Sequence, residues 1–317
     1  MLARRSRAFR RVGLVAWLRI AIGAALFSVN TVVHVLPLLV VALFKALLRF
    51  PAAQTACARI LISIAESWIG VNTQMIRRLT HTRVVAELPA GLSYAGHYLV
   101  LANHQSWVDI PVLQAVFNRK IPFVRFFLKS QLIWVPFLGL AWWALDFPFM
   151  KRYSREILAR HPELAGRDLE TTRRACRKFR GMPISVLIFP EGTRITHFKH
   201  QLQRSPFHHL LKPKAGGVAF VLEAMGDALH TIIDVTIAYP HGKPTFADLF
   251  ANRIPEVRVT VRERQIPADL IGGDYENDRQ ARVRVQTWIN GVWSEKDESI
   301  SNALSPEDVT DARQKTA

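Results

Sequence analysis

The sequence predicts an α/β protein with a single sheet flanked by helices, preceded by an N-terminal membrane-anchoring helix or helical hairpin. Short apolar runs typical of buried strands alternate with longer segments in which apolar residues recur at helical spacing. The stretch from Ile20 to Phe44 contains no charged residue. Because roughly 20 apolar residues suffice to cross a bilayer, this stretch predicts the membrane segment.

Residues 1–50 are expected to form a basic segment and the membrane anchor. The chain opens MLARRSRAFRR, and it lacks the shorter apolar core and clear cleavage site of a signal peptide. We therefore expect an uncleaved anchor with its arginine-rich end in the cytoplasm. Lys45 and Arg49 follow the apolar stretch, which leaves open either one span or a hairpin that returns to the same face. The length of the apolar stretch and the arginines that flank it argue against a core helix of a soluble domain.

Residues 51–296 are expected to form one domain. The predicted strands are Arg83–Ala86, Tyr98–Ala102, Phe123–Leu128, Ile184–Phe189, Thr231–Ala238 and Val257–Arg264. The predicted helices are Ala52–Leu79, Pro111–Phe117, Ser154–Arg180, Gly217–Met225 and Arg279–Trp293. The tryptophan-rich stretch Ser130–Leu145 is interpreted either as a second contact with lipid or as core. Residues 297–317 are polar, and we expect a disordered tail there.

The composition points to an anionic partner. The net charge is +17 and the sequence pI about 10.6, yet zinc-finger spacing, RNP-type aromatic motifs and basic-zipper heptads are missing from the sequence. Anionic membrane lipid and a phosphate-bearing substrate therefore fit better than nucleic acid. The basic run from Lys151 to Arg180 is interpreted as a surface for lipid or for an acidic carrier protein, with a solvated helix face as the alternative. Cys57 and Cys176 give no disulfide framework.

A histidine and an aspartate end the strand Tyr98–Ala102. The sequence continues Asn103-His104-Gln105-Ser106-Trp107-Val108-Asp109. Residues five apart do not meet on one regular helix, but they converge if His104 lies in the loop and Asp109 on the first helical turn. Ser106 to Asp109 matches a capping box, which predicts such a helix start. A carboxylate on one imidazole nitrogen makes the other a better base. The alternative is a capping aspartate beside a buried histidine.

A second polar segment ends the strand Ile184–Phe189. It reads Pro190-Glu191-Gly192-Thr193-Arg194, and ligands bind at the carboxyl ends of strands in α/β sheets. Gly192 lets a ligand approach the backbone, Thr193 offers a hydroxyl, and Arg194 can fork onto a phosphate. An ordinary turn with an exposed arginine is the alternative.

Together the two segments resemble one family. Asn103–Asp109 matches a His-x4-Asp block, and Phe189–Arg194 matches the second signature without a change. The chain is therefore similar to glycerolipid acyltransferases of the 1-acylglycerol-3-phosphate acyltransferase type, over about residues 80–240. Details of the sequence most resemble the branch that includes lysocardiolipin acyltransferases and bacterial inner-membrane relatives. The resemblance implies a glycerol-phosphate acyltransferase-like fold for residues 51–296.

The resemblance also implies the site residues. His104 would be the general base and Asp109 its orienting partner, and Glu191, Gly192, Thr193 and Arg194 would bind the acyl acceptor. Arg152, at the end of Phe149-Met150-Lys151-Arg152, would be a second phosphate-binding residue. The family's proline-containing fourth block is not matched at Val235-Thr236-Ile237.

The implied function is O-acyl transfer. A fatty acyl group would move from acyl-CoA or acyl carrier protein, as co-substrate and without a cofactor, to 1-acyl-sn-glycerol-3-phosphate. The product would be phosphatidate for phospholipid synthesis, made at the cytoplasmic face of a bacterial inner membrane. Alternatives are transfer to another lysophospholipid, as in lysocardiolipin remodelling, and a non-catalytic basic protein of the membrane surface. A metal-dependent phosphohydrolase with His104, Asp109 and Glu191 as ligands is a further alternative, but no His-x-x-x-His or Cys pair supports a metal.

Overall fold

A six-stranded sheet forms the centre of the protein. The structure is a computed structural model that describes residues 13–48, 50–151, 160–161, 167–179, 182–229, 231–271, 273, 275 and 277–305. The sheet has the order β1-β8-β7-β2-β6-β3. Its strands are β1 (Arg83–Glu87), β2 (His97–Ala102), β3 (Val124–Phe126), β6 (Ile184–Ile188), β7 (Thr231–Ala238) and β8 (Glu256–Gln265). The predicted fold class, a sheet flanked by helices behind an apolar N-terminal helix, is confirmed.

The strands that carry the predicted site are parallel neighbours. β2 pairs in parallel with β6 on one side and with β7 on the other, and β3 pairs in parallel with β6. β8 runs antiparallel to β7 and parallel to β1. The central strands are almost wholly apolar and buried, as expected for parallel strands covered on both faces. Their carboxyl ends therefore meet at one edge of the sheet.

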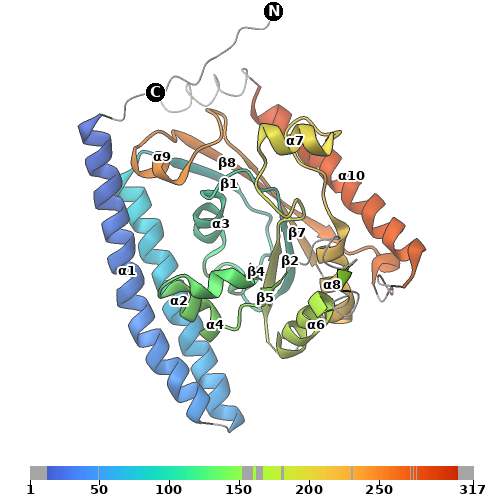
Figure 1. Ribbon diagram of the computed structural model, residues 1–317, viewed down its shortest axis with the longest axis horizontal. Coiled ribbons are helices and arrows are strands. Elements are labelled where there is room, and N and C mark those ends of the chain that lie inside the picture. Colours follow the sequence, from blue (N-terminus) through green and yellow to red (C-terminus); the bar gives the residue numbers. More distant parts are fainter. Residues whose placement is uncertain are drawn as a thin grey trace, which may run out of the picture.

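Helices cover both faces of the sheet (Figure 1). One apolar core joins a face of the sheet to α6 (Arg167–Phe179), α8 (Ala215–Met225) and α10 (Arg279–Ala303). A second core joins the other face to α3 (Asp109–Phe117) and α9 (Phe246–Phe250). Short helices near the sheet include α7 (His197–Gln203), η3 (Gly226–Ala228) and η4 (Ala268–Leu270).

The N-terminal segment forms a helical hairpin. α1 (Leu14–Leu47) and α2 (Pro51–Leu79) lie side by side along one flank of the molecule (Figure 1). α1 continues through Pro37, and the Asn30 amide donates to Asn72 of α2 at 2.8 Å inside the pair. The predicted anchor is thus one continuous helix that packs against α2, and the choice between one span and a re-entrant hairpin in the membrane stays a prediction. α1 is also the helix that is long and apolar enough to cross a membrane within the described residues.

A third apolar cluster joins the hairpin to the segment that follows β3. The predicted strand Phe123–Leu128 is divided into β3 and β4 (Leu128–Lys129), and β4 pairs with β5 (Phe149–Met150) in a separate two-stranded sheet. Between them lie the short helices η1 (Ser130–Trp134) and α4 (Leu138–Ala144). Residues of α4 pack against α1 and α2 in this cluster.

The predicted boundary of the polar tail at Asp297 is wrong. α10 continues to Ala303, and Asp297 is buried within it. The Asp297 carboxylate accepts the backbone N–H groups of His208 and His209, each at 2.7 Å. Polar residues here serve as partners for a neighbouring loop, so their polarity does not indicate a solvated tail. Residues 306–317 of the predicted tail lie outside the described residues.

Candidate active site

The loop after β2 is fixed to the neighbouring strand. The Asn103 side chain donates to the carbonyl of Ile237 at 2.9 Å and accepts its N–H at 2.8 Å. Gln105 donates to the same carbonyl at 2.9 Å. Both amide side chains replace the bonds that strand pairing would have supplied where β2 ends. They hold the residue between them, His104, at the carboxyl edge of the sheet.

His104 and Asp109 meet as the sequence predicts. The Nδ1 atom of His104 lies 2.8 Å from Oδ2 of Asp109, and the His104 side chain is partly exposed whereas Asp109 is fully buried. Because a carboxylate accepts hydrogen bonds, the Nδ1 atom carries the proton and the Nε2 lone pair is left available. The ring of Phe189 stacks on the imidazole, with centroids 4.1 Å apart. The ring is therefore fixed in both tautomer and orientation.

Asp109 is held by three further donors. Oδ2 also accepts the backbone N–H groups of Gln105 at 2.7 Å and Ser106 at 2.8 Å. Oδ1 accepts the hydroxyl of Tyr239 at 2.6 Å. These bonds compensate a carboxylate that is wholly removed from water. Burial also raises the pKa of Tyr239 well above its ordinary value, so this hydroxyl remains a neutral donor.

The predicted capping box is only partly formed. The Ser106 N–H bonds the Asp109 carboxylate as a capping box requires, but the Ser106 hydroxyl accepts from Val108 at 3.0 Å. That hydroxyl donates to the carbonyl of Pro244 at 2.7 Å. The helix therefore begins at Asp109 after a turn, and Ser106 ties this turn to the loop that follows β7.

Glu191 is placed differently from the expectation. Its side chain is fully buried, at 0% exposure. One oxygen accepts the His104 N–H at 2.9 Å and the other accepts the Leu211 N–H at 3.0 Å. Both oxygens bind backbone groups and the side chain is not exposed, so Glu191 does not reach the surface of the site in this arrangement. Its contact with an acceptor stays a prediction. Glu191 clamps three loops together, and its burial raises its pKa to about 8.

Gly192 is exposed, and Thr193 and Arg194 are partly exposed. Gly192 has φ +70°, which favours glycine, and a side chain there would approach Lys214. The Thr193 hydroxyl accepts from the ammonium of Lys199 at 2.7 Å. The Arg194 guanidinium lies 4.4 Å from the centroid of the Trp107 ring. Arg152, the other predicted phosphate ligand, lies outside the described residues.

Lys199 and Lys214 add positive charge that the sequence did not assign to the site. Lys199 lies on α7, shortly after Arg194 in the sequence. Its ammonium also donates to the Arg194 carbonyl at 3.2 Å. Lys214 is bound through its backbone N–H to the carbonyl of Pro190 at 2.9 Å. The edge of the sheet near His104 thus presents several cations, the arrangement that attracts phosphate.

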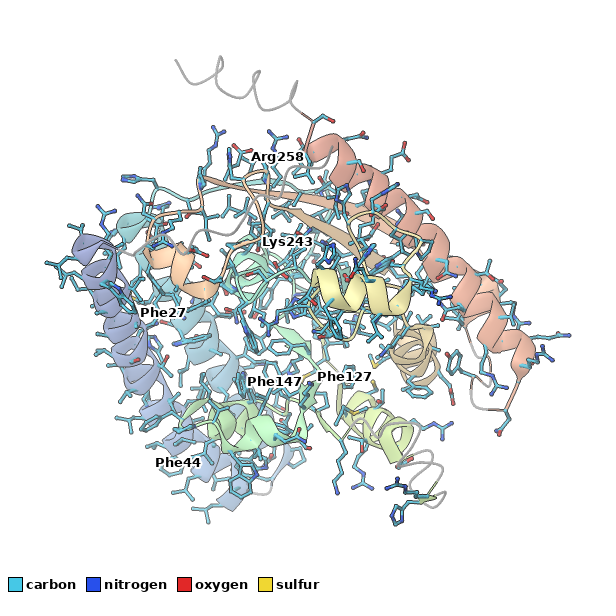
Figure 2. All side chains as sticks on the ribbon, turned by 45° about the horizontal axis from the view of Figure 1, so that its top comes forward. Phe27, Phe44, Phe127, Phe147, Lys243 and Arg258 are labelled. Carbon is cyan, nitrogen blue, oxygen red and sulfur yellow. The ribbon has the colours of Figure 1, made fainter. Side chains whose placement is uncertain are left out.

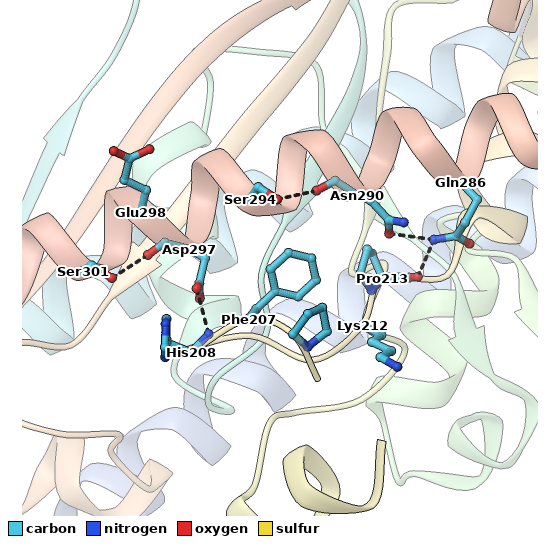
Figure 3. A pocket seen from close by; sticks show the side chains of 11 residues that line it. Phe207, His208, Lys212, Pro213, Gln286, Asn290, Ser294, Asp297, Glu298 and Ser301 are labelled. Carbon is cyan, nitrogen blue, oxygen red and sulfur yellow. Dashed lines mark hydrogen bonds between the residues drawn. The ribbon is translucent and has the colours of Figure 1, made fainter. Parts of the chain in front are cut away.

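A separate groove of about 800 Å³ lies between α10 and the loop 206–213 (Figure 3). It is lined by Phe207, Lys212, Asn290 and Asp297 among others, and by neither His104 nor Asp109. Asp297 and Gln286 of α10 form hydrogen bonds with this loop. The groove is therefore distinct from the sheet edge that carries the histidine.

Comparison with known proteins gives the family. The model of the family described as Acyltransferase matches residues 75–240, more than half of the chain. The chain belongs to the acyltransferase family. This acyltransferase is 24% identical over 254 residues to lysocardiolipin acyltransferase 1 of Mus musculus, covering 75% of this chain and 62% of the relative. It is 23% identical over 214 residues to 1-acyl-sn-glycerol-3-phosphate acyltransferase gamma of the same species, covering 63% of this chain and 52% of the relative.

A solved structure agrees with the fold. The crystal structure of the 1-acyl-sn-glycerophosphate (LPA) acyltransferase PlsC from Thermotoga maritima matches with a TM-score of 0.52 and 16% identity, covering 89% of the acyltransferase described here and 98% of that chain. At this identity the match shows the fold alone. The chain spans about three fifths of the length of the lysocardiolipin relatives.

Proposed function

We propose that the protein is a membrane-bound O-acyltransferase that acylates the free hydroxyl of 1-acyl-sn-glycerol-3-phosphate and so forms phosphatidate. Acyl-CoA or acyl carrier protein would supply the acyl group as a thioester. The observation that carries the proposal is His104, whose Nδ1 is bound by Asp109 and whose Nε2 is available at the carboxyl edge of the sheet. Membership of the acyltransferase family and the names of the relatives support it.

The chemistry needs one base. The Nε2 atom of His104 takes the proton of the acceptor hydroxyl as its oxygen attacks the thioester carbonyl carbon. The carbon–sulfur bond breaks, and the proton on His104 passes to the departing thiolate. Asp109 stabilises the imidazolium between these two transfers. Arg194 is the proposed partner of the acceptor phosphate, and the family resemblance assigns Arg152 the same role.

An acyl-enzyme on Ser106 is not part of the proposal. The hydroxyl of Ser106 donates to Pro244 and accepts from Val108, and the residue is buried. Direct attack by the acceptor requires no such intermediate. Trapping a labelled acyl group on the protein would contradict this step.

A second candidate for the acceptor is another lysophospholipid, such as lysocardiolipin. The name of the first relative and the additional cations Lys199 and Lys214 favour this alternative, because an acceptor with more than one phosphate would use them. The membrane location is proposed from the apolar helix α1, with the domain on the cytoplasmic face of a bacterial inner membrane. Anionic lipid of that membrane is a proposed partner.

The experiment is a panel of acceptors. Purified protein in mixed micelles is given labelled oleoyl-CoA, or the corresponding acyl carrier protein, with lysophosphatidate, lysocardiolipin or other lysophospholipids. Label in phosphatidate is the expected result. Label in another lipid would support the same mechanism with a different acceptor. Transfer from neither donor to any acceptor would overturn the proposal in favour of a non-catalytic membrane-surface protein.

A further inference from the structure

The segment between β4 and β5 carries a large apolar surface with no charge. From Ser130 to Leu145 the sequence contains no charged residue. Trp134 is 85% exposed and Trp143 is 58% exposed, and Phe137 and Leu140 between them are also exposed. Leu140 and Trp143 are three residues apart, so they lie on one side of α4, and Phe137 directly precedes the helix. A cluster of large exposed apolar side chains marks an interaction site.

The opposite side of α4 is firmly packed. Ala141 and Ala144 lie in the apolar cluster shared with Leu38 and Ala42 of α1. Just after α4, Asp146 forms an ion pair of 2.7 Å with Lys45, near the end of α1. The exposed tryptophans therefore belong to an element that is fixed to the hairpin.

The hairpin adds apolar surface at the same end of the molecule. Around its turn the exposed residues are Leu43, Phe44, Leu47, Leu48 and Phe50. Figure 2 shows Phe44 at this end, away from Phe27, and α4 lies toward the same end in Figure 1. The ion pair of Lys45 with Asp146 joins the two surfaces. Both surfaces therefore lie at the same end of the molecule, which we call the apolar end.

Charges border this end in the pattern expected of a membrane interface. Lys129 and Lys151, on either side of the uncharged segment, are both exposed. The nearby carboxylate, Asp146, is already paired with Lys45. Lysines at this position would meet lipid phosphates, and indole rings favour the boundary between headgroups and hydrocarbon. A bilayer, rather than a protein, is the partner that accepts both features.

The packing of α1 determines how far this end can insert. Near its beginning, Phe27 makes edge contacts with Phe246 and Phe250 of α9, and near its end Lys45 binds Asp146. The eighteen helical steps from Phe27 to Lys45 span about 27 Å, nearly the roughly 30 Å of bilayer hydrocarbon. A span by α1 along this length would bury α9 and α4 as well. Insertion of one end of the hairpin into one leaflet leaves α9 outside the bilayer.

We propose that Trp134, Phe137, Leu140 and Trp143 form a second membrane-inserted surface, which enters one leaflet together with the turn of the α1–α2 hairpin. The domain is then held to the membrane at two points, and its rotation about the hairpin is restricted. This inference concerns attachment and does not depend on the acyl acceptor.

Depth measurement on the full chain tests the proposal. A nitroxide label is attached to Leu140→Cys and, as a matched control, to Val283→Cys, which replaces an exposed residue of α10. The native cysteines are both buried, which directs labelling to the new site. In vesicles, the label at position 140 should collide several-fold more with oxygen than with a charged nickel chelate, and the label at 283 should show the reverse. Equal access of the chelate to both labels would overturn the proposal.

A second variant guards against a local effect of the label. Trp134→Ser with Trp143→Ser should weaken partition into vesicles by about tenfold or more, given the usual value of burying such side chains. Val283→Ser should leave partition unchanged. Unchanged partition of the double variant would overturn the lipid assignment. Protection of the position 140 label that depends on protein concentration in detergent would also overturn it, because it would indicate a second copy as the occupant. Neither readout involves acyl transfer, so a failure of the membrane-surface proposal can be distinguished from a failure of the proposed function.

Discussion

Asp109 organises the site because four donors converge on its carboxylate. Two are backbone groups of its own loop and one is His104, but the fourth, Tyr239, comes from the end of β7. The sequence pattern could predict the pair His104 and Asp109, since both lie in one loop. It could not predict Tyr239, because that contact depends on β7 being the neighbour of β2.

Tyr239 is therefore a positioning residue, and Tyr239→Phe should lower kcat by about tenfold or more while the KM for the acceptor stays unchanged. A hydrogen bond to a charged group contributes about 1.5–3 kcal/mol, and the loss falls on the orientation of His104. Steady-state kinetics in mixed micelles measures it. The control is Tyr98→Phe, a buried tyrosine of β2 whose hydroxyl accepts from Ser93 away from the site. Equal kcat values for wild type and Tyr239→Phe would contradict the role.

Glu191 predicts a pH dependence of stability. Its pKa of about 8 in the folded protein lies above its ordinary value, because burial disfavours the charged form. At a pH between the ordinary pKa of a glutamate and about 8, Glu191 is ionised in the unfolded chain but keeps its proton in the folded protein. The contribution of Glu191 to stability is thus fully present at low pH and is lost as pH rises toward about 8, by at most about 1.4 kcal/mol per pH unit.

The test compares wild type with Glu191→Gln, which cannot ionise. The variant should be less stable at pH near 5, because its amide cannot accept both backbone N–H groups. The difference between the thermal midpoints should narrow as pH approaches 8. A difference that stays constant or widens over this range would show that Glu191 is ionised in the folded protein.

At the scale of elements, α1 is fitted to the domain at Gly23. A methyl group on Gly23 would collide with the buried ring of Phe250 in α9. α9 follows the loop whose Pro244 holds Ser106. The packing of α1 on α9, at Gly23 and at Phe27, thereby connects α1 to the site.

Two helical glycines should respond oppositely to alanine. Gly23→Ala should lower the thermal midpoint, because overpacking typically costs about 1–3 kcal/mol. Gly291→Ala, at a position of α10 with open space around it, should raise the midpoint through about 0.5–1 kcal/mol of helix propensity. Unfolding in detergent micelles measures both. A rise with Gly23→Ala would mean that α1 does not pack on α9 as described.

Element ends were predicted less well than the elements themselves. The start of α3 and the strand β6 follow from local patterns, and both are present. The end of α10 does not follow from a local pattern. Lys296 is buried against Asp234 and the carbonyl of Val235, and only the assembled sheet supplies these contacts. The same reason explains Glu191, whose two backbone partners come from different loops.

At the scale of the whole molecule, the net charge of +17 predicts salt-sensitive attachment to anionic membranes. Part of the basic run from Lys151 to Arg180 is exposed, as at Arg160 and Arg174, while Arg173 pairs with Glu223 of α8. Binding to vesicles that contain anionic lipid should weaken markedly as salt increases. Binding to zwitterionic vesicles should change little, because only the apolar end contributes there. Equal salt dependence on both vesicle types, by co-sedimentation, would contradict a charged contact.

The central claim is that His104 is the base of an acyl transfer to a lysophospholipid. The most direct measurement follows labelled oleoyl-CoA and lysophosphatidate with wild type, His104→Ala and a control, His97→Ala, at the opposite end of β2. The rate should fall by about 10²–10⁴-fold in His104→Ala alone, with the thermal midpoint of the protein preserved. Wild-type rates of phosphatidate formation in folded His104→Ala would contradict the account.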